Sequence, residues 1–165
     1  MFLIKDLVSN PASAVLSSTS GSNKTLGGAV SWNPNDSKGG LDTKGNTSRP
    51  AFVGLAHELA HVWAAMNGRD RSSETWMTFS NGDVRTKSEF LATHFENQIR
   101  SENNLPLRAY YADGREGSLL VPGTSLSMFF YHLKYFSADG TDTMIQVPYD
   151  YSNDVGKGGN GLESK

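Results

Sequence analysis

The sequence predicts an α+β fold in which a small antiparallel sheet packs on a buried helix and a second helix lies beside it. Residues 51–68, AFVGLAHELAHVWAAMNG, carry no ionisable side chain outside one short motif, as expected of a helix buried nearly all round. Residues 86–103 repeat apolar side chains at helical spacing, whereas residues 25–32 and 143–151 have the composition of strands.

The 165 residues suit one compact domain, and we expect a single domain over residues 1–165. Residues 1–24 run into the Ser-rich stretch SSTSGSNK, and residues 153–165 are rich in Gly and polar side chains. We expect both ends to be loosely ordered.

Composition excludes several classes of function. The net charge is −2 and the basic residues form no run, so we expect no binding to nucleic acid or to an acidic membrane. The chain contains no cysteine, so any metal site must use nitrogen and oxygen ligands. The start, MFLIKDLVSN, has too short an apolar run for a secretory signal, and no apolar stretch is long enough to span a bilayer.

The uncharged helix contains the motif HELAH, from His57 to His61. The two histidines are i and i+4, so they project from one helical face and can share one metal ion. Glu58 lies about 100° round the helix, close enough to reach a metal-bound water without ligating the ion. Burying three polar groups without partners is costly, which favours a metal. The alternative is two core histidines with Glu58 as a hydrogen-bond partner.

The segment before this helix is predicted to be one strand over residues 25–32, in which Gly27 and Gly28 permit close backbone approach, followed by turns over residues 33–50. An edge strand here could pair with an extended substrate, or it could simply pack on the helix. The sequence leaves both readings open. Pro50 suits the first turn of the helix, and Asn67-Gly68 suits its end.

A third metal ligand would come from the second helix. Glu89 and Glu96 both flank its apolar face, but they lie about 10 Å apart along the axis, so only one of them can bind the ion. Glu89 is the candidate, with a capping box from Thr86 to Glu89 as the alternative. Glu96 fits an ion pair with Arg100 or a hydrogen bond to a metal-binding imidazole.

The two other histidines are not expected to bind this metal. His94 points about 140° away from Glu89 around the helix. His132 lies in the aromatic run of residues 127–136, which fits a strand or a short helix, and is predicted to be a hydrogen-bonded core or pocket residue. Between these histidines, Arg108 and Tyr111 could supply donors to an oxyanion, although their spacing also fits a surface ion pair and a core edge.

Three segments of the sequence, RPAFVGLAHELAH, SEFLATHFENQIR and LPLRAYY, together resemble the NleD-type effector zinc metallopeptidases. These proteins occur as effectors injected into host cells and as C-terminal toxin domains of Rhs-type proteins. The resemblance covers roughly residues 25–111 and implies a minimal zincin of the gluzincin type, similar around the metal to clostridial neurotoxin light chains.

The resemblance also implies roles for residues. By this similarity His57, His61 and Glu89 would bind one Zn²⁺, and Glu58 would act as the general base. Arg108 and Tyr111 would match an Arg-x-x-Tyr pair that stabilises the transition state, with the neighbouring Tyr110 as the competing phenol. Ser88-Glu89 departs from the paired acidic residues that the family often shows, which would weaken the support of a ligand.

The expected function is that of a zinc-dependent endopeptidase, a secreted effector or toxin domain that cleaves a protein in the cytoplasm of a target cell. A cognate inhibitor, or immunity protein, is expected if the target is a sister bacterium, and a larger Rhs-type carrier is a candidate source of the domain. Two alternatives remain open: a zinc hydrolase acting on a non-protein amide, and an inactive binding module with a structural zinc.

Overall fold

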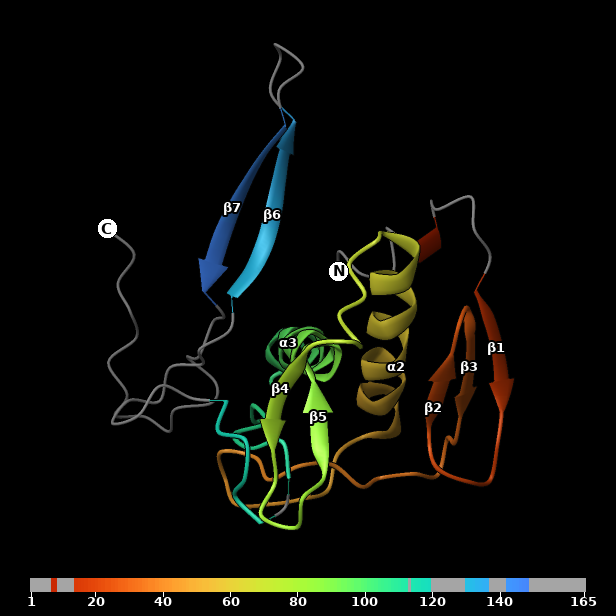
Figure 1. Ribbon diagram of the computed structural model, residues 1–165, viewed down its shortest axis with the longest axis vertical. Helices are drawn as coiled ribbons and strands as arrows, with labels where there is room; N and C mark the ends of the chain where they lie inside the picture. Colours follow the sequence, from red (N-terminus) through yellow and green to blue (C-terminus); the bar gives the residue numbers. More distant parts are fainter. Residues whose placement is uncertain (1–6, 9–13, 113, 120–129, 137–141, 149–165) are drawn as a thin grey trace.

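A computed structural model describes residues 7–8, 14–112, 114–119, 130–136 and 142–148, the last two ranges by their backbone only. Figure 1 shows a small sheet, helix α2 (Ala51–Met66) and helix α3 (Lys87–Glu102) side by side, with α2 between the sheet and α3. The α+β class predicted from the sequence is confirmed.

The sheet contains β1 (Val15–Ser18), β3 (Ala29–Trp32) and β2 (Lys24–Leu26), in that spatial order. The prediction of one strand over residues 25–32 is wrong, because Gly27 adopts a φ of 58° and the chain turns back to pair β2 with β3 antiparallel. β1 pairs with β3 in parallel, so the sheet is mixed rather than antiparallel throughout. Ser17 and Ser18, which were expected in a loop, belong to β1.

Helix α2 is buried between the sheet and α3. Its N-cap is Pro50, and it ends at Asn67 and Gly68, as predicted. The φ of 62° at Gly68 is the left-handed conformation typical of a helix end. Val30 of β3 is 1% exposed and the Trp32 indole donates to the carbonyl of Ala51, which fixes the sheet against the first turn of the helix.

The opposite side of α2 packs on α3. The core cluster consists of small and aromatic side chains from the two helices: Ala60, Trp63, Ala64, Ala92 and Phe95. Trp63 and Phe95 meet edge to face with 4.9 Å between their ring centroids. The small residues let the helices approach closely, which brings polar side chains on the two facing surfaces within contact distance.

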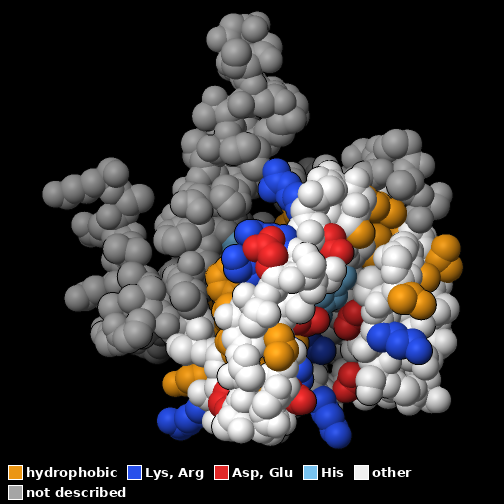
Figure 2. All heavy atoms as spheres, in the orientation of Figure 1, with side chains coloured by type: hydrophobic (Ala, Val, Ile, Leu, Met, Phe, Trp, Pro, Cys, Tyr) orange, Lys and Arg blue, Asp and Glu red, His pale blue; other side chains and the backbone are white. Residues whose placement is uncertain are grey.

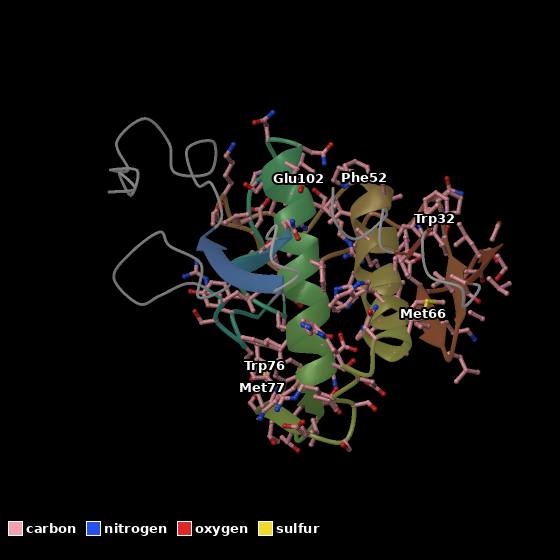
Figure 3. All side chains as sticks on the ribbon, turned by 90° about the horizontal axis from the view of Figure 1, so that it is seen from above. Trp32, Phe52, Met66, Trp76, Met77 and Glu102 are labelled. Atoms are coloured by element: carbon pink, nitrogen blue, oxygen red, sulfur yellow. The ribbon has the colours of Figure 1, made fainter. Side chains whose placement is uncertain are left out.

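A β-hairpin introduces α3. β4 (Thr75–Thr78) pairs antiparallel with β5 (Val84–Thr86), and β5 leads directly into the helix. Thr86 is the N-cap, but its side chain makes no capping hydrogen bond, so the capping box considered for Glu89 is not formed. Figure 3 shows the labelled side chains of Trp76 and Met77 of this hairpin near one end of α3, with Glu102 at the other end.

A second hairpin, β6 (Phe130–Phe136) with β7 (Asp142–Pro148), follows in the chain. It resolves the choice between helix and strand for the aromatic run in favour of a strand, and β7 ends at Pro148. The predictions for the His132 side chain and for residues 153–165 lie outside what the structure describes. In the described part of the chain, neither helix has the length and apolar character needed to cross a bilayer.

The contact between α2 and α3 should dominate stability. We expect Phe95→Ala to lower the free energy of unfolding by about 3–5 kcal/mol, because the ring is 5% exposed and leaves a cavity against Trp63. The matched control is Phe52→Ala on α2, where the ring is 43% exposed and the cost should be under about 1 kcal/mol. Urea denaturation of the two variants measures the difference, and equal losses would contradict this account of the core.

Candidate metal centre

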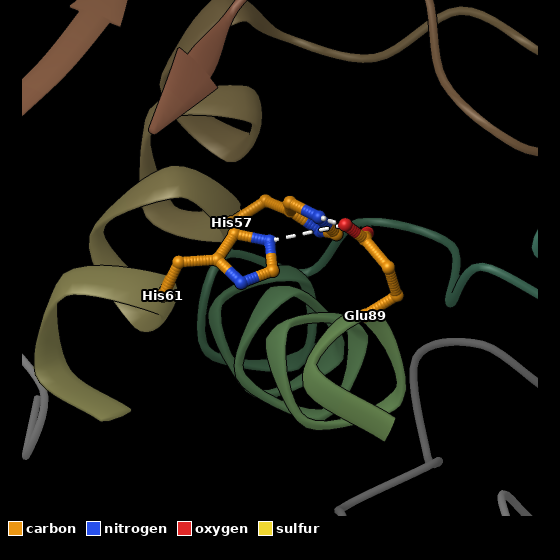
Figure 4. Close-up of side chains that lie close together, drawn as sticks. All are labelled: His57, His61 and Glu89. Carbon is orange, nitrogen blue, oxygen red and sulfur yellow. Dashed lines mark hydrogen bonds and ion pairs between the residues drawn. The ribbon is translucent and has the colours of Figure 1, made fainter. Parts of the chain in front are cut away.

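Three of the sequence-predicted residues come together between the helices. One ligand atom from each of His57, His61 and Glu89 lies within 4.8 Å of the other two, and Figure 4 shows both imidazoles turned toward the carboxylate. His57 Nε2 is 3.1 Å from Glu89 Oε2, and His61 Nε2 is 3.5 Å from Glu89 Oε1. The structure thus selects Glu89 rather than Glu96 as the carboxylate that faces both histidines.

The cluster fits a metal ion on its own chemistry. Nitrogen and oxygen ligands about 2.0–2.1 Å from a tetrahedral ion stand about 3.3 Å from each other, close to the two observed separations between the imidazoles and Glu89. The described residues bring together two imidazoles and one carboxylate, with no fourth His, Asp or Glu in the group. Such a set leaves one position of a four-coordinate ion for water or substrate.

Each histidine is held at its other ring nitrogen. His57 Nδ1 is 3.2 Å from Glu96 Oε2, and His61 Nδ1 is 3.1 Å from Ser88 Oγ. These contacts fix the rings so that both Nε2 atoms face Glu89. The contact between Glu96 and His57 was one of the two alternatives predicted for Glu96. Ser88 was expected to weaken the support of a metal ligand, but it contacts His61 and supports it.

Glu96 is the most heavily engaged side chain of the site. It is 0% exposed, and its two oxygens accept hydrogen bonds from three guanidinium groups: Arg108 at 2.8 Å, Arg100 at 3.0 Å and Arg49 at 3.3 Å. Burial raises the pKa of Glu96, but these arginines and His57 outweigh burial and hold the pKa well below its usual value. Both predicted roles of Glu96 are therefore observed, since it pairs with Arg100 and also contacts the imidazole of His57.

Tyr111, rather than Tyr110, faces the cluster. Its hydroxyl donates to Glu89 Oε2 at 2.6 Å, whereas Tyr110 pairs through its backbone with Ser118. Burial raises the pKa of Tyr111, and the adjacent negative charge of Glu89 raises it further, so the phenol keeps its proton. Burial also raises the pKa of Glu89, but His57, His61 and Tyr111 outweigh it and lower the value to about 2.

Arg108 lines the cleft but directs three of its donors at groups outside the cluster. Its Nε donates to the carbonyl of Tyr110, Nη2 to the carbonyl of Tyr111 and Nη1 to Glu96, and the side chain is largely buried. Asn97 holds the Arg108 backbone at both its N–H and its carbonyl. This arginine therefore fixes the backbone that carries Tyr111.

Glu58 contacts β2 at the wall of the cleft. The Thr25 hydroxyl is 2.7 Å from Glu58 Oε2 and 3.1 Å from the Glu58 carbonyl. Glu58, the two cluster histidines, Glu89 and Tyr111 all line one cleft of about 710 Å³. Figure 2 shows this hollow on the surface, with histidine side chains in it and both acidic and basic side chains beside them.

Some of these contacts escaped the sequence analysis. Arg49 and Thr25 were not assigned to the site, because their contacts with Glu96 and Glu58 join segments far apart in the sequence. Gly54 could have indicated a contact here, because a glycine inside a helix often marks close packing. A Cβ at this position would lie 2.9 Å from Arg49 Nη2. His94 lies outside the cluster, as predicted.

The fold and the cluster define a small α+β domain with a site that can hold a metal ion. A model of the peptidase M91 family, described as effector proteins, matches residues 2–111 of the 165-residue chain. The chain belongs to this family, which confirms the resemblance to the NleD-type effector metallopeptidases. Comparisons with curated proteins and with solved structures found no match.

Replacing Glu96 should destabilise the domain in a pH-dependent way. We expect Glu96→Gln to lower the free energy of unfolding near pH 7 by about 3–5 kcal/mol, because three arginines lose their shared counter-charge. Because the pKa of Glu96 is depressed, its contribution is full above the unfolded value of about 4.3 and is lost as pH falls below it.

Urea denaturation from about pH 7 down to pH 3 should show a steeper loss in the wild type than in Glu96→Gln. Glu102→Gln, at the exposed end of α3, is the control and should leave the curve unchanged. Identical pH dependence of the wild type and Glu96→Gln would contradict the proposed contribution of Glu96.

Metal binding should release protons. Burial lowers the pKa of His57, but hydrogen bonds and charges from Glu89 and Glu96 outweigh burial and raise it. The metal-free imidazole therefore holds an extra proton just above its usual pKa of about 6.5, whereas a metal ligand must be unprotonated. We expect zinc affinity to rise from about pH 6 to pH 8. Calorimetry in buffers of different ionisation enthalpy measures the protons released, and zero release near pH 6.5 would contradict the assignment.

Proposed function

We propose that this domain is a zinc endopeptidase that cleaves a protein of the target cell. The observation that carries the proposal is the convergence of His57, His61 and Glu89 beside Glu58 in one cleft, in a chain of an effector peptidase family. Two imidazoles and one carboxylate suit Zn²⁺, which when bound polarises a carbonyl and lowers the pKa of water to about 7.

The residues of the chain would divide the work as follows. Glu58 accepts a proton from the attacking water and delivers it to the leaving amine, and Thr25 holds its Oε2 in position for this step. Tyr111, kept neutral by burial and by Glu89, would turn its hydroxyl from Glu89 to donate a hydrogen bond to the oxyanion that develops on the substrate carbonyl. Arg108 keeps Tyr111 in place by binding its backbone carbonyl.

The substrate is proposed to lie along β2. This strand is an edge of the sheet and its Thr25 touches Glu58, so a peptide that paired with β2 would pass directly by the base. β2 also pairs with β3 and packs on α2, which was the alternative considered for this segment. The two readings of this segment are therefore compatible.

A structural zinc fits the site less well. A structural site is closed by four protein ligands, whereas the group found among the described residues has three and opens into a cleft. The same openness would serve hydrolysis of another amide, but the peptidase family favours a protein substrate. We propose injection into a host cell as the route of delivery. An Rhs-type carrier with a cognate inhibitor is the variant of this proposal for a bacterial target.

Separating catalysis from metal binding tests the proposal. We expect Glu58→Gln to retain zinc at the wild-type affinity but to lower proteolysis by at least about 10²-fold, because the base is lost while the ligands stay. His57→Ala should lose both zinc and activity. The assay incubates each zinc-loaded protein with a target-cell lysate and maps new protein termini by mass spectrometry.

Arg71→Gln, which alters an exposed ion pair with Glu74 outside the cleft, is the control and should behave as wild type. Full proteolysis by Glu58→Gln would refute the mechanism. Zinc binding without any new termini from wild type would refute the peptidase function itself.

A further inference from the structure

Arg49 differs from the other two arginines that surround Glu96. Arg100 donates to the carbonyl of Pro106 and Arg108 to two further carbonyls, so both have main-chain acceptors besides Glu96. The Arg49 side chain makes one hydrogen bond to a described residue, from Nη1 to Glu96, and it is the longest of the three at 3.3 Å. The Arg49 backbone N–H donates to the Ser37 carbonyl. Arg49 Nε is buried without a partner among the described residues, as is Arg100 Nη2.

The Arg49 side chain is nevertheless buried and built into the wall of the cleft. Only 10% of it is exposed, and it lines the same cleft as Glu58 and the cluster histidines. Two glycines make room for it: a Cβ at Gly54 would lie 2.9 Å from Nη2, and a Cβ at Gly39 would lie 3.0 Å from Cδ. A buried cation with most of its donors unused is costly, and such sites are completed by an anion.

The ion pairs of Glu96 also favour an anion beside Arg49. One carboxylate, Glu96, faces three guanidinium groups, which leaves positive charge in excess beneath the cleft. Asp36 also lines the cleft, but its oxygens accept hydrogen bonds from the Asn23 amide and the Lys38 N–H, and it forms no ion pair with Arg49. The described part of the chain therefore offers Arg49 no second carboxylate.

The position of Arg49 relates it to the bond that would be cleaved. Arg49 and His57 contact the same oxygen, Glu96 Oε2, so guanidinium and imidazole are neighbours across one atom. An extended peptide advances about 3.3 Å per residue, so a side chain that reaches Arg49 belongs to a residue next to the reacting bond or one further along. A guanidinium offers paired donors that match a carboxylate.

We propose that Arg49 forms a subsite that selects an acidic side chain, Asp or Glu, within two residues of the cleaved bond. This inference rests on the proposed function, because it assigns a substrate preference to the same cleft. Arg49 would bind the substrate carboxylate through Nη2, while Nη1 stays on Glu96. The exposed Lys38 at the cleft adds positive charge that favours the same ligand.

The test uses binding rather than turnover. The probes are short peptides that carry a metal-binding hydroxamate with two residues either before or after it, and with Asp or Asn at either position. Those that extend after the hydroxamate have a carboxamide end. We expect the zinc-loaded wild type to bind the better Asp peptide at least about 10-fold more tightly than its Asn counterpart. In Arg49→Gln this ratio should fall below about 2-fold. Lys44→Gln removes a positive charge outside the cleft and should keep the wild-type ratio.

Each other outcome overturns the subsite. Equal binding of Asp and Asn peptides by wild type, or an unchanged ratio in Arg49→Gln, would do so. A preference for peptides with a free C-terminal carboxylate, whatever their side chains, would assign Arg49 to a chain end instead. Thermal unfolding checks the variants, and if Arg49→Gln is unfolded, Arg49→Lys replaces it, with an expected ratio between wild type and 1.

The subsite and the peptidase function can fail separately. Hydroxamate binding requires the ion but no catalysis, so a wild type that selects Asp peptides yet cleaves no protein retains the subsite and loses the function. The opposite result is also possible: the domain could produce new termini without acidic residues near the cleaved bond and bind the two peptides equally. That result would support the peptidase function and exclude the subsite.

Discussion

The buried carboxylate of Glu96 is the constraint on which the rest of this structure depends. It is 0% exposed and contacts four side chains. Arg49 precedes α2 and His57 lies within it, whereas Arg100 lies one turn further along α3 and Arg108 follows that helix. A charge in such a place is tolerated only when its partners satisfy it completely. The same contacts that make burial tolerable also fix the orientation of one metal-facing imidazole and of the backbone behind Tyr111.

Local sequence patterns predicted the parts of the site that lie on single elements. The i, i+4 spacing in HELAH placed His57 and His61 on one face of α2, and the helical period of α3 separated Glu89 from His94. The choice of Glu89 over a capping box needed more than spacing, because the same residues satisfy both patterns. In the structure Thr86 makes no capping hydrogen bond, and Glu89 is occupied by two imidazoles and a phenol.

The features that sequence reasoning missed depend on tertiary contacts. The reversal at Gly27 turned one expected strand into two, since a glycine pair permits either continued extension or a turn. Thr25, Ser88 and Arg49 each touch a site residue that is distant in sequence or one helix away, and no periodicity encodes such a contact. Arg108, predicted as a donor to an oxyanion, lines the cleft, and no spacing in the sequence encodes its hydrogen bonds to Glu96 and to main-chain carbonyls.

One strand, β2, is an edge of the sheet, lines the cleft with Lys24 and Thr25, and carries the hydroxyl that contacts Glu58. A peptide bound along that edge would therefore affect the orientation of the Glu58 carboxylate. An inhibitor designed as a β-strand mimic could block the domain by pairing with this edge, without any group that binds the metal ion. Substitution of the metal-binding residues would not weaken such an inhibitor, because it would form hydrogen bonds mainly with the backbone of β2, which point mutations leave in place.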